Sequence, residues 1–107
     1  MVLIIGGAAQ GKKRYAEENY PDARLFLLND WAKKLFDDGK DPLKELDPEM
    51  LRSEDLVVIT EEVGNGIVPL DKAEREFREC IGRLQVETAA KAKEVIRVIC
   101  GLGIKIK

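Results

Sequence analysis

Met1-Val-Leu-Ile-Ile-Gly-Gly-Ala-Ala-Gln-Gly-Lys-Lys-Arg14 is the stretch of this sequence that decides its fold. Its apolar run, residues 2–5, ends at two glycines and predicts a buried β-strand. The segment that begins at Lys12 predicts a helix. Between the two, Gly6, Gly11 and Lys12 match the pattern G-x-x-x-x-G-K of a phosphate-binding loop, or P-loop. The stretch therefore predicts a strand, a loop and a helix that bind the phosphates of a nucleotide.

Such a loop binds phosphate because consecutive backbone N–H groups point to one place. The helix that follows adds its unpaired N-terminal donors and the positive end of its dipole. Glycine gives the loop its conformational freedom, and Lys12 is placed to reach the β- and γ-phosphates. The competing interpretation is a glycine-rich strand–helix turn that binds nothing. The predicted phosphate-binding residues are Gly6, Gly7, Ala8, Ala9, Gln10, Gly11, Lys12 and Lys13.

Lys13 stands where the P-loop pattern has Ser or Thr. The hydroxyl at that position normally gives Mg²⁺ an oxygen ligand, whereas an ammonium group has donors only. The sequence therefore argues against Mg²⁺ held in the usual way. Three explanations are open: Lys13 neutralises phosphate charge in place of the metal, the loop holds an anion without turnover, or Lys13 simply faces solvent.

Alternating strand and helix patterns predict the fold class. Further buried strands are expected at residues 23–28, 56–60 and 95–100, with helices at 12–19, from Asn29 or Asp30 as the N-cap, and at 71–93. The rhythm predicts an α/β fold, a three-layer P-loop NTPase-like parallel sheet with helices on both faces, in one domain of residues 1–107. Residues 104–107 alternate Ile and Lys, which fits a C-terminal edge strand with its lysines in water.

The long helix shows its buried face in the sequence, because apolar or small residues recur every three or four positions. A shorter helical segment, broken or started at Pro48, is expected to carry Leu43, Leu46, Met50 and Leu51. The face expected for the long helix consists of Ala73, Phe77, Cys80, Ile81, Leu84 and Thr88.

Composition excludes several classes of function. The net charge is −2 with both signs interleaved, so no basic field indicates nucleic-acid binding. The longest apolar runs are far shorter than a bilayer requires, and no leader pattern precedes the first strand, so we expect no membrane partner. Cys80 and Cys100 are interpreted as reduced core thiols of a cytoplasmic protein, with a disulfide or a metal site as the alternative. The chain has no histidine, which excludes histidine-based catalysis by its residues.

Acidic residues follow two of the predicted strands, where phosphoryl transfer needs them. Asp30 follows the second strand, and Glu61 and Glu62 follow the third. Such a carboxylate can hold a metal ion or accept a hydroxyl proton. We expect Asp30 as the candidate metal ligand and Glu62 as the candidate catalytic carboxylate. The ordinary alternatives are a helix cap for Asp30 and a solvated loop charge for Glu61 or Glu62.

Residues 58–69, Val-Ile-Thr-Glu-Glu-Val-Gly-Asn-Gly-Ile-Val-Pro, resemble the V-T-N-E-V-G-x-G-I-V-P segment of the adenosylcobinamide kinase/adenosylcobinamide-phosphate guanylyltransferase family. The resemblance extends through Arg83 to the C-terminus, and Gly6-Gly7-Ala8 with Gly11-Lys12 is similar to that family's phosphate loop. It implies a P-loop kinase-like fold in cobalamin biosynthesis that binds GTP or ATP. It also implies phosphorylation of a corrinoid hydroxyl, GMP transfer through a histidine, and a homotrimer.

This sequence departs from the family in four places. It is shorter between the P-loop helix and the third strand, it lacks the histidine that accepts GMP, and Lys13 replaces the P-loop Ser. The fourth is Gln85-Val86, which stands where the family has an Asn-Gln pair on the long helix. Guanylyl transfer through histidine is therefore not carried over. What the resemblance carries over is the fold together with Lys12, Glu62 and Arg83 as candidate catalytic residues.

Three hypotheses remain from different classes of function. The first is a compact nucleotide-dependent kinase in which Lys12 holds phosphates, Arg83 assists with charge and Glu62 orients or deprotonates the acceptor hydroxyl. The second is a non-catalytic relative that binds a nucleotide or a corrinoid, as a regulator or subunit. The third is an assembly protein that uses only its oligomer surface.

Overall fold

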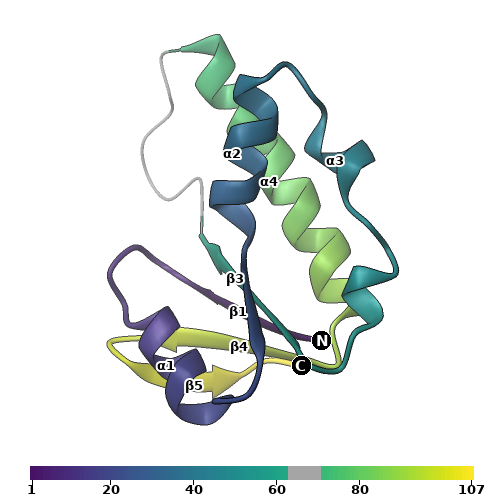
Figure 1. The fold of residues 1–107 in the computed structure, drawn as a ribbon. Coiled ribbons are helices and arrows are strands. Elements are labelled where there is room, and N and C mark those ends of the chain that lie inside the picture. The colour runs from purple at the N-terminus through teal and green to yellow at the C-terminus, as the bar shows by residue number, and fades with distance from the viewer. Residues whose placement is uncertain (63–70) are drawn as a thin grey trace.

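A computed structural model describes residues 1–62 and 71–107 and shows an α/β fold (Figure 1). Residues 63–70, which hold most of the motif after the third strand, lie outside the described residues. The elements follow the predicted alternation of strands and helices. In chain order they are β1 (Val2–Gly6), α1 (Lys12–Asn19), β2 (Arg24–Leu27), α2 (Leu28–Asp37), α3 (Pro42–Glu45), the 3₁₀ turn η1 (Met50–Arg52), β3 (Leu56–Glu61), α4 (Lys72–Lys91), β4 (Glu94–Ile99) and β5 (Leu102–Lys105).

The five strands form one sheet in the order β2-β3-β1-β4-β5. The first four are parallel, and β5 pairs antiparallel with β4 at the edge. Gly6 at the end of β1 is in register with Glu61 at the end of β3. The carboxyl ends of β1 and β3 therefore lie together, which is where open parallel sheets bind ligands.

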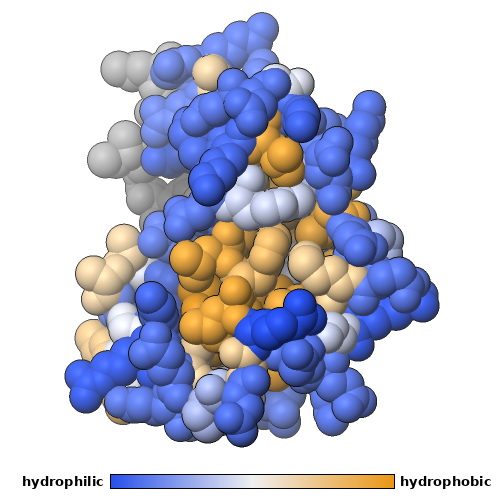
Figure 2. Space-filling model, viewed as in Figure 1, coloured by the Kyte–Doolittle hydropathy of each residue, from blue (hydrophilic) through white to orange (hydrophobic). Residues whose placement is uncertain are grey.

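Helices cover both faces of this sheet, so the predicted three layers are confirmed (Figure 1). Strand residues alternate between two apolar clusters, as the pleat requires. Leu3 and Val58 pack with α2 and α4 on one face, whereas Ile4 and Val57 pack with Ala16 of α1 on the other. Figure 2 shows apolar side chains gathered over the sheet between α1 and α2, surrounded by polar ones.

The N-cap prediction for α2 is wrong. The helix begins at Leu28, directly after β2, and its N-cap is Leu27 without a side-chain cap. Asn29 and Asp30 therefore lie inside the first turn, and the Asn29 side chain bonds to Thr60 and Glu61 of β3. In contrast, α4 begins as predicted after Asp71, whose carboxylate accepts from the Ala73 N–H at 2.8 Å.

Two details of the predicted helices change in the structure. The segment around Pro48 forms two short pieces, α3 and η1. On α4, Ile81, Leu84 and Thr88 are buried as expected, but Ala73 is exposed because the first turn extends beyond the core. Among the described residues, no helix is both long and apolar enough to cross a bilayer.

Cys100 is not the core thiol that its apolar neighbours predict. It is exposed in the two-residue turn that joins β4 to β5, with φ 51, and Gly101 follows with φ 76. Two positive φ values in a two-residue hairpin loop match the twist of the flanking strands. Cys80 is half-buried on α4, and both thiols are free. The edge strand is confirmed, but it begins earlier than predicted, at Leu102.

Candidate functional site

The loop between β1 and α1 is fixed by close backbone contacts. A Cβ added to Gly6 would lie 2.5 Å from the carbonyl oxygen of Val98 on β4, so only glycine fits there. Gly11 has φ 88 and Ala9 has φ 56, both in the left-handed region. The sequence therefore places a glycine at the tightest contact and another at a left-handed position, and α1 begins immediately afterwards at Lys12.

Gln10 ties this loop to the C-terminal hairpin. Its side-chain Oε1 accepts from the Cys100 N–H at 2.8 Å, and its backbone carbonyl accepts from the Gly101 N–H at 2.8 Å. The hairpin lies so close that a Cβ on Gly11 would be 3.3 Å from the Gly101 Cα. The predicted phosphate loop is thus held in shape by residues from the other end of the chain, a contact that the sequence pattern does not show.

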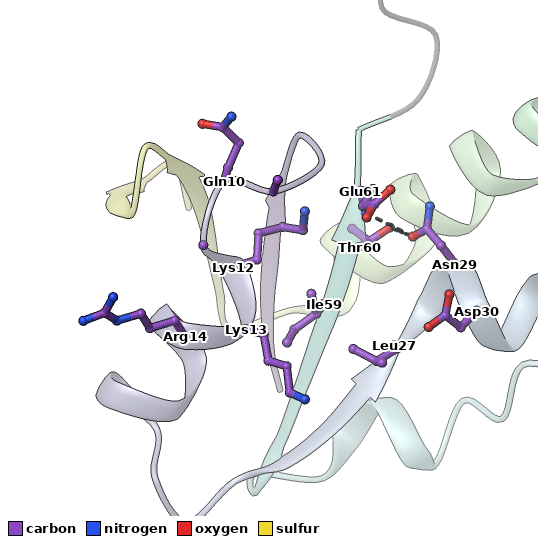
Figure 3. A pocket seen from close by; sticks show the side chains of 12 residues that line it. Gln10, Lys12, Lys13, Arg14, Leu27, Asn29, Asp30, Ile59, Thr60 and Glu61 are labelled. Atoms are coloured by element: carbon purple, nitrogen blue, oxygen red, sulfur yellow. Dashed lines mark hydrogen bonds between the residues drawn. The ribbon is translucent and has the colours of Figure 1, made fainter.

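Lys12 is buried at the N-terminus of α1, with 7% of its surface exposed. Its ammonium donates to the Gly7 carbonyl oxygen at 2.5 Å, inside the loop that it follows. In Figure 3 the side chain extends from α1 toward Thr60 and Glu61 on β3. A buried cation beside the free N–H groups of a helix start is suited to an anionic ligand.

A cavity of about 300 Å³ opens between this loop, β3 and the start of α2 (Figure 3). Lys12 and Lys13 come from the loop side, and Asn29, Asp30 and Glu61 come from the opposite side. Its complete lining is Ala9, Gln10, Gly11, Lys12, Lys13, Arg14, Leu27, Asn29, Asp30, Ile59, Thr60 and Glu61. The structure therefore places the second half of the predicted loop and the candidate metal ligand Asp30 around one cavity.

The wall opposite the loop is built by a hydrogen-bond network that sequence reasoning missed. Asn29 Oδ1 accepts from the Thr60 hydroxyl at 2.6 Å and from the Glu61 N–H at 3.0 Å. Gln85 Nε2, on α4, donates to Thr60 Oγ1 at 2.9 Å and to the Glu61 carbonyl at 2.6 Å. The signal available was a polar residue directly after an apolar strand, which also fits a helix cap.

Glu62 is not among the residues that line this cavity. Its carboxylate pairs with Arg97 of β4, and its backbone N–H donates to the Gly6 carbonyl at 3.0 Å. Arg97 could not be predicted as its partner, because the contact depends on the order of the strands. The candidate catalytic carboxylate therefore lies beside the start of the loop rather than in the cavity beyond it.

Arg83 lies on α4, exposed, with its guanidinium 2.8 Å from the Glu79 carboxylate. It lines a different cavity of about 460 Å³, between α4 and the segment that joins α2 to α3, together with Phe36, Leu43 and Cys80. Burial there raises the pKa of the Cys80 thiol. Within one chain, the structure does not bring Arg83 together with Lys12.

The residues at the cavity do not fit a magnesium ion held through a loop hydroxyl. Lys13 brings an ammonium, and Asp30 is the carboxylate that the sequence proposed as a ligand. In residues 1–62 and 71–107, no group of three His, Cys, Asp or Glu side chains could hold a metal ion.

Most of the chain matches a model of a known protein family. A family model described as "Cobinamide kinase / cobinamide phosphate guanyltransferase" matches residues 24–106. Two curated relatives, the bifunctional adenosylcobalamin biosynthesis proteins CobU of Escherichia coli K12 and of Salmonella typhimurium LT2, are 48% identical to this chain over 52 residues. That match covers 49% of this chain but only 29% of each relative. The glycine loop precedes the residues matched by the family model.

Proposed function

Because this chain belongs to the cobinamide kinase / cobinamide phosphate guanyltransferase family, we propose that it binds the phosphates of GTP or ATP through residues 6–13. The observation that carries the proposal is the buried Lys12, which follows a glycine loop at the carboxyl end of the central strand and faces the cavity. Helix N-terminal N–H groups and a nearby ammonium together favour a polyphosphate. Lys13, on the same wall, adds a second positive charge that offsets part of the phosphate charge.

We further propose that the bound nucleotide phosphorylates a hydroxyl group of a corrinoid, the kinase half of the activity in the family's description. The hydroxyl oxygen attacks the γ-phosphorus, the bond from that phosphorus to the bridging oxygen of the nucleotide breaks, and a carboxylate takes the hydroxyl proton. Asp30 and Glu61 line the cavity and are placed for that last role. Glu62 and Arg83 remain candidates from the resemblance, outside this cavity within one chain.

The second transfer in the family's description is not proposed for these 107 residues, since they contain no histidine to accept GMP. A non-catalytic relative that holds a nucleotide or corrinoid is the alternative function. The observation that favours it is Lys13, which supplies no ligand to a metal where a hydroxyl normally stands. A homotrimer belongs to the proposal through family resemblance, and sedimentation equilibrium tests it.

Calorimetric titration with GTP and with ATP, with and without Mg²⁺, tests nucleotide binding. Lys12→Ala should weaken binding by roughly a hundredfold, because a charge-assisted contact to phosphate is lost from a buried site. Lys44→Ala, which removes the same charge at an exposed position of α3, should leave the affinity within about twofold. Equal effects of the two variants, or no binding by the unchanged chain, would contradict the proposal.

Phosphoryl transfer is tested separately by incubation with γ-labelled GTP or ATP and adenosylcobinamide. Formation of labelled corrinoid by the unchanged chain, but not by Lys12→Ala, supports the proposed kinase activity. Nucleotide binding without labelled product, while a full-length family enzyme is active in parallel, selects the non-catalytic alternative.

A further inference from the structure

The Asn29 side chain has only one possible orientation in this structure. The backbone N–H of Glu61 lies 3.0 Å from one of its side-chain atoms and can only donate, so that atom must be the oxygen. The Thr60 hydroxyl accepts from Gln85 Nε2 at 2.9 Å and lies 2.6 Å from the same Asn29 oxygen, to which it gives its proton. Gln85 thus donates to Thr60, and Thr60 donates to Asn29.

This orientation leaves the Asn29 Nδ2 group pointing away from the network. In the part of the chain that the structure describes, no protein acceptor takes its two hydrogens, and Figure 3 shows the nitrogen on the side of the amide away from Thr60. Asn29 lines the cavity and is half-buried. A rigidly oriented donor of this kind costs little to order when a ligand accepts from it.

The chemistry around Asn29 determines which part of a ligand it meets. Lys12 and Lys13 face the cavity from the loop side, whereas Asp30 and Glu61 stand beside Asn29. Two carboxylates repel phosphate, so the polyphosphate belongs to the loop side. A hydroxyl group suits the other side, because it can accept from Asn29 and donate to a carboxylate at the same time.

We propose that Asn29 is a substrate-binding residue, whose Nδ2 donates a hydrogen bond to the hydroxyl oxygen of the alcohol that accepts the phosphoryl group. The proposal rests on the proposed function and names the residue that selects its second substrate. With one lone pair held by Asn29 and the O–H directed to Asp30 or Glu61, the remaining lone pair faces the loop side. Asn29 thereby aims the attacking oxygen, and the network from Gln85 keeps Asn29 in place.

Asn29→Asp tests this, because aspartate keeps an acceptor for Thr60 and Glu61 but replaces the donor by a charged carboxylate oxygen. We expect cobinamide, used as the alcohol probe in equilibrium dialysis, to bind roughly five- to tenfold more weakly. Affinity for the nucleotide should fall by less than the affinity for cobinamide, because the added charge lies on the side opposite Lys12 and Lys13. Asn19→Asp makes the same chemical change at the exposed end of α1 and should alter neither affinity.

The side-chain NH₂ signals of Asn29 in a ¹⁵N-labelled sample give a readout that a structural role would not move. They should shift when cobinamide is added and should not shift with nucleotide alone. Signals that respond to the nucleotide alone, or to neither ligand, overturn the assignment, as does unchanged cobinamide affinity in Asn29→Asp. Nucleotide titration of the same sample distinguishes failure of this inference from failure of the proposed function. If the chain binds nucleotide and cobinamide but the Asn29 signals do not shift, only this inference is refuted.

Discussion

The Glu62 carboxylate accepts two hydrogen bonds from the Arg97 guanidinium, 2.7 Å from Nε and 3.3 Å from a terminal nitrogen. Glu62 follows β3 and Arg97 lies on β4, and the central strand β1 runs between these two strands. The Glu62 N–H also donates to Gly6, the last residue of β1. The ion pair therefore crosses the sheet where the phosphate loop begins, which links the two strands that flank the loop.

A double-mutant cycle with Glu62→Gln and Arg97→Met should give a coupling free energy of about 1 kcal/mol in urea unfolding. The two-contact geometry and the 19% exposure of the Glu62 side chain raise it above that of a solvated pair. The matched control is Arg83 with Glu79, whose side chains are 66% and 65% exposed and which should couple by less than about 0.5 kcal/mol. Equal coupling in the two cycles would contradict the structural role assigned to Arg97.

Gly6→Ala should destabilise the fold by about 2–3 kcal/mol, because the new Cβ would lie 2.5 Å from the Val98 carbonyl oxygen. That oxygen belongs to the backbone of β4 and cannot turn aside as a side chain does. Strands β1 and β4, which carry Gly6 and Val98, would have to move apart. We expect the thermal midpoint and the nucleotide affinity to fall together, measured by circular dichroism and calorimetry.

Gly82→Ala is the matched control for this change. Gly82 lies inside α4, and an added Cβ would meet no atom within 4 Å. Alanine should therefore stabilise the helix by about 0.5–1 kcal/mol through lower backbone entropy in the unfolded chain. A loss of stability at Gly82, or no loss at Gly6, would show that the contacts around these glycines are not as described.

Asp55 should make stability depend on pH in the acid range. The Arg24 guanidinium, 2.9 Å away, and the Ser53 hydroxyl lower the pKa of this carboxyl from 3.8 to about 2. A lowered pKa in the folded state stabilises the fold above the unfolded value, and this contribution is lost as pH falls from about 4 to 2. The urea midpoint of the unchanged chain should therefore exceed that of Asp55→Asn at pH 7, and the gap should close toward pH 2.

Salt separates this effect from a general loss of acid stability. The Arg24 and Asp55 side chains are 61% and 56% exposed, so the gap at pH 7 should narrow in 1 M NaCl through screening. A gap that keeps its size down to pH 2, or that grows with salt, would exclude this pair as its source.

Local sequence was sufficient to predict most of the fold. The runs at β1, β3 and β4 are short, apolar and bounded by turns or polar residues, and the spacing of Ile81, Leu84 and Thr88 marks the buried face of α4. Cys100 was predicted as a core thiol because it directly continues the apolar run of β4, and nothing in the composition marks where that strand ends. Its positive φ comes from the hairpin turn. Cysteine is an uncommon residue at such a position.

The candidate site was predictable only where it is continuous in sequence. The loop from Gly6 to Lys13 carries its own pattern, whereas the wall opposite depends on bonds between residues far apart in the chain. Asn29 or Asp30 was expected to cap a helix, but the Asn29 side-chain oxygen instead accepts a hydrogen bond from the N–H of Glu61, 32 residues later. Arg97 contacts Glu62 across β1, which lies between β3 and β4. No single segment of the sequence determines this strand order.

Replacement of Lys13 by serine tests how this loop manages without the usual hydroxyl. Lys13 lines the cavity on the same side as Lys12, so its charge is available to phosphate. Lys13→Ser restores an oxygen ligand and removes that charge, so nucleotide affinity should fall without Mg²⁺ and recover with it. We expect the ratio of affinities with and without Mg²⁺ to rise roughly tenfold, about 1.4 kcal/mol. Lys34→Ser, the same substitution at an exposed position of α2, should leave that ratio unaltered. If the ratio stays the same in Lys13→Ser, Lys13 does not stand in for the metal.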